Sequence, residues 1–169
     1  MNPPRIAVNV SAVQLRRRQF IEEVREALAE SGGFRHIDIE ITESMLMEDI
    51  EGNIGKLKAL QEMGVNVALD DFGTGYCSLA YLAKLPINSL KVDRSFVAPM
   101  AHGAEQMAIV STIVSLAHAL NLKVCAEGVE TQEQANLLRL LRCDEVQGFF
   151  FARPGPEAQA VDSLKQGGG

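Results

Sequence analysis

The sequence has few cysteines and histidines, and neither residue type is spaced like the ligands of a soft metal. Its three cysteines are odd in number and form no CxxC pair. This pattern favours reduced thiols and argues against a sulfur-bound metal. The three histidines are too scattered for a zinc signature. The cysteines are Cys77, Cys125 and Cys143, and the histidines are His36, His102 and His118.

Long apolar runs and an excess of basic residues are also missing. No apolar stretch approaches the ~18 residues of a spanning helix, and residues 1–11 lack the pattern of a secretory signal. We therefore expect no membrane segment and a cytoplasmic location. Lysine and arginine total 16 against 22 aspartates and glutamates, a formal net charge of -6. This argues against binding of duplex DNA or RNA, and an anionic substrate would need cations brought in from solution.

The sequence does contain a regular succession of strand and helix patterns. Its 169 residues, of which 47% are apolar, predict a single globular domain over 1–169. Strand and helix patterns alternate, which predicts parallel strands with right-handed crossovers. Strands are expected at 6–11, 37–42, 65–70, 89–96, 122–130 and 146–154. Helices are expected around 20–28, 46–57, 78–85, 109–120, 131–141 and 157–164.

The stretch from Val65 to Leu82 joins a strand, two carboxylates, a glycine-containing turn and a short helix. Asp70 and Asp71 end the strand, and Gly73 and Gly75 allow a sharp turn after them. In a parallel α/β fold, ligands bind at such junctions. An aspartate-rich turn is also common between a strand and a helix, so the pair alone favours an ordinary turn.

Polar residues stand between large aliphatic residues, or just after them, in the other predicted strands as well. Alternate side chains of a strand point to opposite faces, so each polar residue faces away from its aliphatic neighbours. In a barrel, the aliphatic residues can pack outward on the helices while the polar ones point to the axis. We therefore expect these polar side chains to lie close together near the carboxyl ends of the strands. The residues are Asn9, Glu40, Lys91, Glu127 and Gln147.

Each of these residues alone has an ordinary explanation. Asn9 alone is typical of a strand or cap, Glu40 and Lys91 alone of solvent-facing positions, and Gln147 by itself indicates little. Cys125 has inward parity and fits a core position better than a nucleophile. Equivalent positions on five separate strands nevertheless favour a functional site.

The predicted site contains too much negative charge to remain ionised without a counter-charge. Glu40, Asp70, Asp71 and Glu127 cannot all stay charged in a partly buried place unless something neutralises them. Oxygen ligands point to Mg²⁺ or Mn²⁺. A carboxylate that reaches two such ions is the arrangement of a two-metal phosphodiesterase. Lys91 could then orient the attacking water or stabilise developing charge.

Six segments follow one another between Val8 and Pro154, namely VNVS, EITES, ALDDFGTGY, LKVDRSF, AEGVET and QGFFFARP. Together and in this order they resemble the EAL domain family of cyclic di-GMP phosphodiesterases. The resemblance implies an EAL-type (β/α)8 TIM-like barrel, which opens cyclic di-GMP to linear pGpG with two Mg²⁺ or Mn²⁺ ions.

The resemblance also implies a role for each candidate residue. Asn9, Glu40 and Asp70 look like ligands of one ion. Asp70 would bridge to the second ion, which Asp71 and Glu127 complete.

Three further residues resemble catalytic residues of the family. Lys91 looks like the residue that holds the attacking water, and Gln147 like a site residue near it. Glu43 corresponds to a glutamate that steadies the loop Phe72–Ser78, and the resemblance implies that this loop couples dimer contact to metal and substrate binding. Cys77 stands in this loop where the family usually has serine.

The resemblance further implies that the chain holds about six of the eight βα units. A full barrel takes ~250 residues, so roughly 80 are expected before VNVS, including a strand with the Glu-Ala-Leu motif. That motif is expected to be absent from the chain. Without the two strands, those at Val8 and Phe149 would present open edges, which predicts self-association or a homodimer.

Two functions follow from these expectations. The first is metal-dependent hydrolysis of cyclic di-GMP by the parent domain, with sensory or regulatory domains expected upstream in the parent protein. The second is a catalytically inactive domain that acts as a cyclic di-GMP receptor or protein-interaction module. The missing glutamate favours the second function for this chain in isolation.

Overall fold

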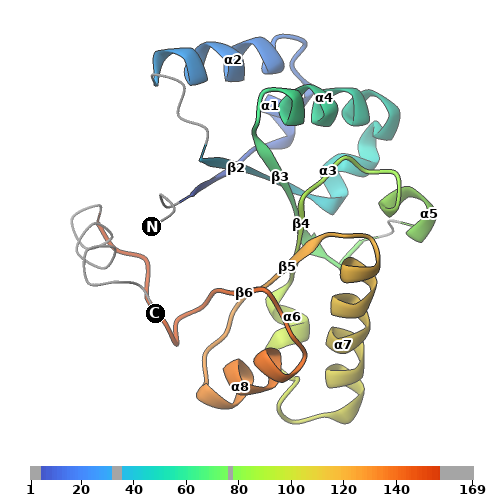
Figure 1. Cartoon of the computed structure of the whole chain (residues 1–169), viewed down its shortest axis with the longest axis vertical. Coiled ribbons are helices and arrows are strands. Elements are labelled where there is room, and N and C mark those ends of the chain that lie inside the picture. The colour runs from blue at the N-terminus through green and yellow to red at the C-terminus, as the bar shows by residue number, and fades with distance from the viewer. Residues whose placement is uncertain (1–4, 32–35, 76–77, 157–169) are drawn as a thin grey trace.

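The fold is a curled sheet of six parallel strands that lie in space in the order of the chain (Figure 1). The computed structural model describes residues 5–31, 36–75 and 78–156. The predicted barrel of about six βα units is thereby confirmed as an open half-barrel. The strands are β1 (Ile6–Asn9), β2 (Ile37–Thr42), β3 (Asn66–Phe72), β4 (Ser89–Val92), β5 (Lys123–Ala126) and β6 (Glu145–Val146).

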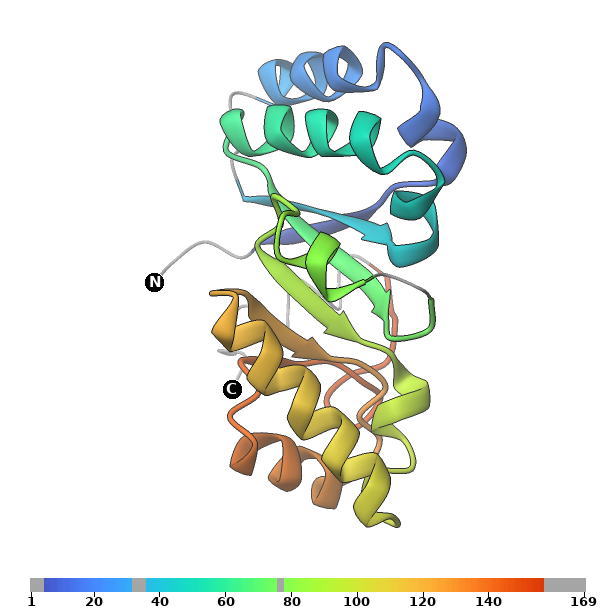
Figure 2. The same ribbon diagram turned by 90° about the vertical axis from the view of Figure 1, so that its right-hand side faces the viewer.

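The helices lie along the outer side of the curled sheet. α1, α2 and α4 lie beside the first strands, and α7 and α8 lie beside the last (Figures 1 and 2). This leaves the inner side of the sheet for polar residues. The helices are α1 (Ala12–Arg16), α2 (Phe20–Glu30), α3 (Glu43–Glu48), α4 (Ile50–Glu62), α5 (Leu79–Leu82), α6 (Arg94–Val97), α7 (Ala104–Ala119) and α8 (Gln132–Leu140).

Capping residues begin and end several helices where the sequence predicts. The Ser78 side chain accepts a hydrogen bond from the backbone N–H of Tyr81 at the start of α5. Thr131 and Gln134 form the predicted capping box of α8. Asn121 follows α7 with a φ of 58°, a left-handed conformation that asparagine tolerates and that cannot continue a helix.

Four predicted strands, the first, fourth, fifth and sixth, end earlier than expected. The fourth ends at Val92, because the Asp93 side chain accepts from the backbone N–H of Ser95 and caps α6. The sixth ends at Val146 and does not extend to residue 154. There the N–H of Phe151 bonds the carbonyl of Gly148 at 3.0 Å, which turns the chain out of the sheet.

The predicted helix around 46–57 is two helices that meet at Asp49. This residue has a φ of -149° and a ψ of 76°, and its side chain accepts from the N–H of Gly52 at 3.1 Å. Aspartate competes for backbone donors in this way, and it therefore ends α3 and starts α4. The helix predicted around 157–164 lies outside the described residues.

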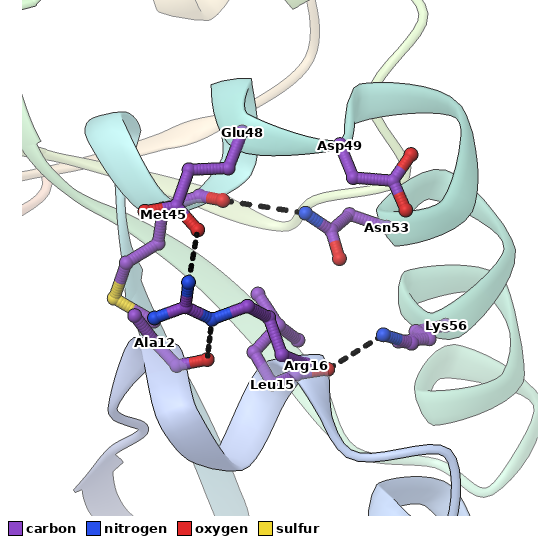
Figure 3. A pocket seen from close by; sticks show the side chains of 8 residues that line it. All are labelled: Ala12, Leu15, Arg16, Met45, Glu48, Asp49, Asn53 and Lys56. Carbon is purple, nitrogen blue, oxygen red and sulfur yellow. Dashed lines mark hydrogen bonds and ion pairs between the residues drawn. The ribbon is translucent and has the colours of Figure 1, made fainter.

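A polar pocket of about 390 Å³ marks where α1 meets α3 and α4 (Figure 3). The Lys56 ammonium donates to the carbonyl of Leu15 at 2.6 Å, and Arg16 pairs with Glu48 at 3.5 Å. Asn53 donates to the carbonyl of Met45 at 3.3 Å. These contacts join the three helices, so the polar groups of the pocket are explained by packing.

The two faces of the sheet differ as the alternation predicts. Large aliphatic residues of the strands, such as Ile41, Leu69 and Leu90, are buried in the core under the helices. The opposite face borders a cavity of about 340 Å³. Its lining includes Asp38, Glu40, Ala68, Ser89, Lys91, Cys125, Glu145 and Gln147.

Within the described residues, β1 pairs only with β2, and β6 only with β5. Ile6 and Val8 of β1 are 55% and 44% exposed. Three phenylalanines after β6, residues 149–151, are also exposed. The predicted open edges are therefore present. None of the described helices is long and apolar enough to cross a bilayer.

Gly148 lies so close to the β5 exit loop that a side chain cannot fit. A Cβ atom there would stand 2.1 Å from the carbonyl oxygen of Val129. We expect Gly148→Ala to lower the free energy of unfolding by about 1–3 kcal/mol in urea denaturation. Gly55→Ala is the matched control, because nothing lies within 4 Å of its added Cβ in the interior of α4. It should raise the free energy by roughly 0.5–1 kcal/mol. Equal effects of the two changes would contradict the prediction.

Asp144 provides a pH-dependent contribution to stability. Partial burial opposes its charge, but hydrogen bonds from His118 and the N–H of Val124 outweigh this and hold its pKa below the ordinary value. A carboxylate with a lowered pKa stabilises the fold above its unfolded pKa, and this stabilisation is lost as pH falls through the folded pKa. We expect Asp144→Asn to lower the free energy of unfolding by less than about 1 kcal/mol at pH 7, because the side chain is partly exposed. The difference should shrink below about pH 4. A difference that is constant from pH 7 to pH 3 would contradict this role.

Candidate active site

The candidate site is built around Lys91 of β4, on the inner face of the sheet. Its ammonium nitrogen lies 2.6 Å from Glu127 Oε1 and 2.8 Å from Glu40 Oε2. Asp70 Oδ1 is 3.4 Å away. These carboxylates come from β2, β3 and the exit of β5. The structure thus brings together Glu40 and Glu127, which are 87 positions apart in the sequence.

An irregularity in β3 places two consecutive aspartates on the same side. The register between β3 and β4 shifts between Leu69 and Phe72, and Asp71 has a left-handed φ of 54°. Strict alternation would direct neighbouring side chains to opposite faces. The bulge instead places carboxylate oxygens of Asp70, Asp71 and Glu127 within 4.8 Å of one another.

The electrostatics of the site reflect crowding of like charges. Burial raises the pKa of Glu127, and Asp70 and Glu40 add to this, while Lys91 opposes it. Burial followed by repulsion from Asp70 also raises the pKa of Asp71. Burial disfavours the charge of Lys91, but hydrogen bonds to Glu127 and Glu40 outweigh it and raise the pKa of the ammonium. Lys91 therefore stays charged and partly neutralises the carboxylates.

The donor atoms of this site fit a hard divalent cation. Asp70, Asp71 and Glu127 each offer a carboxylate oxygen in one small region. Oxygen donors of this kind suit Mg²⁺ or Mn²⁺ better than zinc. The residues therefore fit the ions that the sequence predicts, although their assignment as ligands stays a prediction.

Glu43 joins the site to the loop after β3. This side chain is 2% exposed, although it lies in the first turn of α3. Its Oε2 atom accepts hydrogen bonds from the N–H groups of Gly73 at 3.1 Å and Gly75 at 3.3 Å. The predicted contact with the loop therefore exists at these two residues. The predicted departure at Cys77 lies outside the described residues.

Two candidate residues are more exposed than the acidic group. Asn9 is paired with Glu40 in the strand register, but its side chain is exposed. Gln147 lines the cavity beside Lys91, and it is also exposed. No side-chain hydrogen bond links either residue to the carboxylates in the part of the chain that the structure describes. Their predicted roles stay predictions.

The sequence analysis missed one acidic neighbour of the site. Asp93 lies close enough to Asp71 to raise the pKa of that carboxyl. Its own carboxylate accepts from the N–H of Ser95 at 2.9 Å. The signal was present in the sequence, because Ser89, Lys91 and Asp93 follow one another at the spacing of one strand face.

One expectation about the sequence is wrong as stated. The letters Glu-Ala-Leu do occur, at Glu26–Leu28, although they were expected to be absent. They belong to α2, on the outer side of the sheet, and Glu26 is exposed. This tripeptide is therefore remote from the carboxylates around Lys91 and does not serve as a strand-end motif.

Cys125 lies on the inner face opposite Lys91 in the register of β4 and β5. Burial raises the pKa of its thiol to about 12. The thiol is therefore protonated near neutral pH and is a poor nucleophile, but Cys125 lines the inner cavity and not the predicted core.

Comparison with known proteins places the chain in a family. The "EAL domain" family model matches residues 1–154. The chain is 46% identical over 160 residues to the bifunctional diguanylate cyclase/cyclic di-GMP phosphodiesterase MucR of Pseudomonas aeruginosa. The match covers 94% of the chain and 23% of that protein, so the chain spans about a quarter of this relative.

Solved structures of similar proteins share the fold. The MucR phosphodiesterase in complex with c-di-GMP has a TM-score of 0.88 at 45% identity, over 92% of this chain and 64% of that one. The EAL domain of Mycobacterium smegmatis DcpA has a TM-score of 0.92 at 40% identity, over 98% and 74% of the two chains. A manganese/cy-diGMP complex of Klebsiella pneumoniae BlrP1 has a TM-score of 0.81 at 30% identity, over 89% and 39%. With its six-stranded half-barrel and the family match over nearly its whole described length, the chain belongs to the EAL domain family.

Proposed function

We propose that this chain carries the catalytic residues of a metal-dependent phosphodiesterase that hydrolyses cyclic di-GMP to linear pGpG. The main support is the convergence of Glu40, Asp70 and Glu127 on Lys91, with Asp71 beside them. Relatives named as cyclic di-GMP phosphodiesterases, and a similar protein solved with manganese and cyclic di-GMP, support the substrate and the ion.

The residues divide the chemistry among them. Asn9, Glu40 and Asp70 would hold one Mg²⁺ or Mn²⁺, and Asp70, Asp71 and Glu127 the other. Such ions, when bound, neutralise phosphoryl oxygens and lower the pKa of a water molecule.

Hydrolysis forms one bond between a water oxygen and phosphorus and breaks one phosphorus–oxygen ester bond, which opens the ring. Lys91, with its persistent charge, would position the water, and Gln147 would lie near it. Glu43 would hold the loop backbone at Gly73 and Gly75, so that the aspartates before it keep their place.

A second candidate function is binding of cyclic di-GMP without turnover. The exposed side chain of Asn9 favours it, because that side chain makes no hydrogen bond to the carboxylates among the described residues. The ligand set of the first ion is then incomplete among the described residues, and the domain would act as a receptor or interaction module.

The setting of this function is also proposed. We infer a cytoplasmic location, where a nucleotide second messenger is met, and sensory or regulatory domains in the parent protein. The exposed edge of β1 supports self-association, including a homodimer.

Incubation with cyclic di-GMP separates the two functions. We expect linear pGpG to form with Mn²⁺ at pH 8. No pGpG should form when EDTA is present from the start, because the negatively charged carboxylates repel the phosphoryl oxygens unless a cation neutralises them. The product is measured by chromatography, and binding is measured by calorimetry on the same sample. Bound cyclic di-GMP without any product would contradict hydrolysis and favour the receptor function.

The Asp70→Asn substitution tests the metal site. It removes a proposed bridging ligand but also relieves repulsion with Asp71, so we expect the fold to persist and Mn²⁺ affinity to fall at least about tenfold. Asp38→Asn is the matched control, because Asp38 lines the same face with the same charge but pairs with Arg5. Calorimetric titration measures both. An Mn²⁺ affinity unchanged by Asp70→Asn, or lowered equally by Asp38→Asn, would contradict the assignment.

A further inference from the structure

The ammonium group of Lys91 is in contact with three carboxylates. A lysine ammonium has three N–H donors and no acceptor. Three carboxylates surround it, at 2.6 Å for Glu127, 2.8 Å for Glu40 and 3.4 Å for Asp70. Its side chain is only 7% exposed, so water screens these contacts little. In this arrangement Lys91 is the counter-ion of the acidic group.

The same carboxylates are the proposed ligands of two divalent ions. Glu40 belongs to one ligand set, Glu127 to the other, and Asp70 to both. The Lys91 nitrogen lies between these sets, in contact with members of each. A divalent cation held by these carboxylates would lie close to the ammonium, and the two positive charges would repel each other at this range.

We propose that Lys91 sets the affinity of the site for divalent cations by competing with them for the carboxylates of Glu40 and Glu127. This inference rests on the proposed function, from which it takes the Mg²⁺ or Mn²⁺ ions. It gives Lys91 a second role besides contact with the attacking water.

The two roles of Lys91 are coupled through its donors. While the ammonium is hydrogen-bonded to Glu127 and Glu40 and paired with Asp70, at most one of its three N–H donors is left to hold a water molecule. Engagement of Glu40 and Glu127 by divalent cations frees at least two of these donors. Lys91 can then hold the reacting water with these donors only when the ions are bound.

Removing the charge of Lys91 tests the competition. We expect Lys91→Met to bind Mn²⁺ about tenfold more tightly or better than the wild-type chain, because a neighbouring positive charge changes the cation affinity of a carboxylate by one or more orders of magnitude. Methionine is unbranched and keeps most of the volume of the side chain. Calorimetry at the same pH measures the Mn²⁺ affinity of both proteins, and circular dichroism checks the fold.

Lys123→Met is the matched control. Lys123 lies on the neighbouring strand β5, is 70% exposed and pairs with Glu145 at 3.5 Å. It removes the same formal charge outside the acidic group, so we expect its Mn²⁺ affinity to stay within about twofold of the wild type, since exposed charges are well screened.

The outcomes separate this inference from the proposed function. Tighter binding by Lys91→Met alone supports the competition. Equal or weaker binding by Lys91→Met, with a wild-type chain that binds Mn²⁺, overturns the competition and leaves the metal site standing. A wild-type chain and a Lys91→Met variant that both fail to bind Mn²⁺ overturn the metal-dependent function and this inference together. Equal tightening by Lys123→Met overturns a specific role of Lys91.

A measurement on the wild-type chain tests the competition between Lys91 and divalent cations if Lys91→Met does not fold. The side-chain signals of ¹³C-labelled lysines are recorded by NMR with and without Mg²⁺, and Lys91 is assigned from Lys91→Arg. We expect the Lys91 signal to shift on addition of Mg²⁺ while the Lys123 signal stays in place. A Lys91 signal that Mg²⁺ does not move, in a chain that binds Mg²⁺, overturns the inference.

Discussion

The ion pairs of Lys91 are the interaction on which the site depends. Carboxylates from three different segments lie on the inner face of the sheet, and their mutual repulsion would be costly if nothing neutralised it. A single buried ammonium reduces this cost and draws the carboxylates together. Because Lys91 is in β4, at the middle of the sheet, it reaches β2 on one side and the exit of β5 on the other.

The same arrangement explains why the fold tolerates a polar inner face. The aliphatic side chains of the strands point to the outer side of the sheet, where the helices cover them. A parallel sheet with one apolar face can therefore be stable while its other face carries charge. Glu43 holds the loop after β3 in a similar way. Its buried carboxylate accepts hydrogen bonds from two backbone N–H groups of this loop, which has no helix or strand of its own.

Close backbone contacts also hold together the segments that follow β4, β5 and β6. Gly148 packs against the backbone of Val129, and the left-handed Gly128 leaves room for the side chain of Arg94. Arg94 in turn pairs with Glu130 at 2.8 Å. The exits of β4, β5 and β6 are thereby joined, which fixes where Glu127 and Gln147 leave their strands.

The sequence by itself determined the order of the strands, the longer helices and the parallel sheet, and it placed Glu40 and Lys91 on the inner face, whereas the short helices α1 and α6 were not predicted. The predicted features follow from local periodicity and capping, which depend on neighbours in the chain. Tertiary structure decided the rest. The bulge that turns Asp71 toward Asp70, the early ends of β4 and β6, and the break at Asp49 depend on pairing, on helix caps and on backbone packing. The engagement of Lys91 by three carboxylates depends on the curl of the sheet, because only curvature brings the ends of separate strands within reach of one side chain.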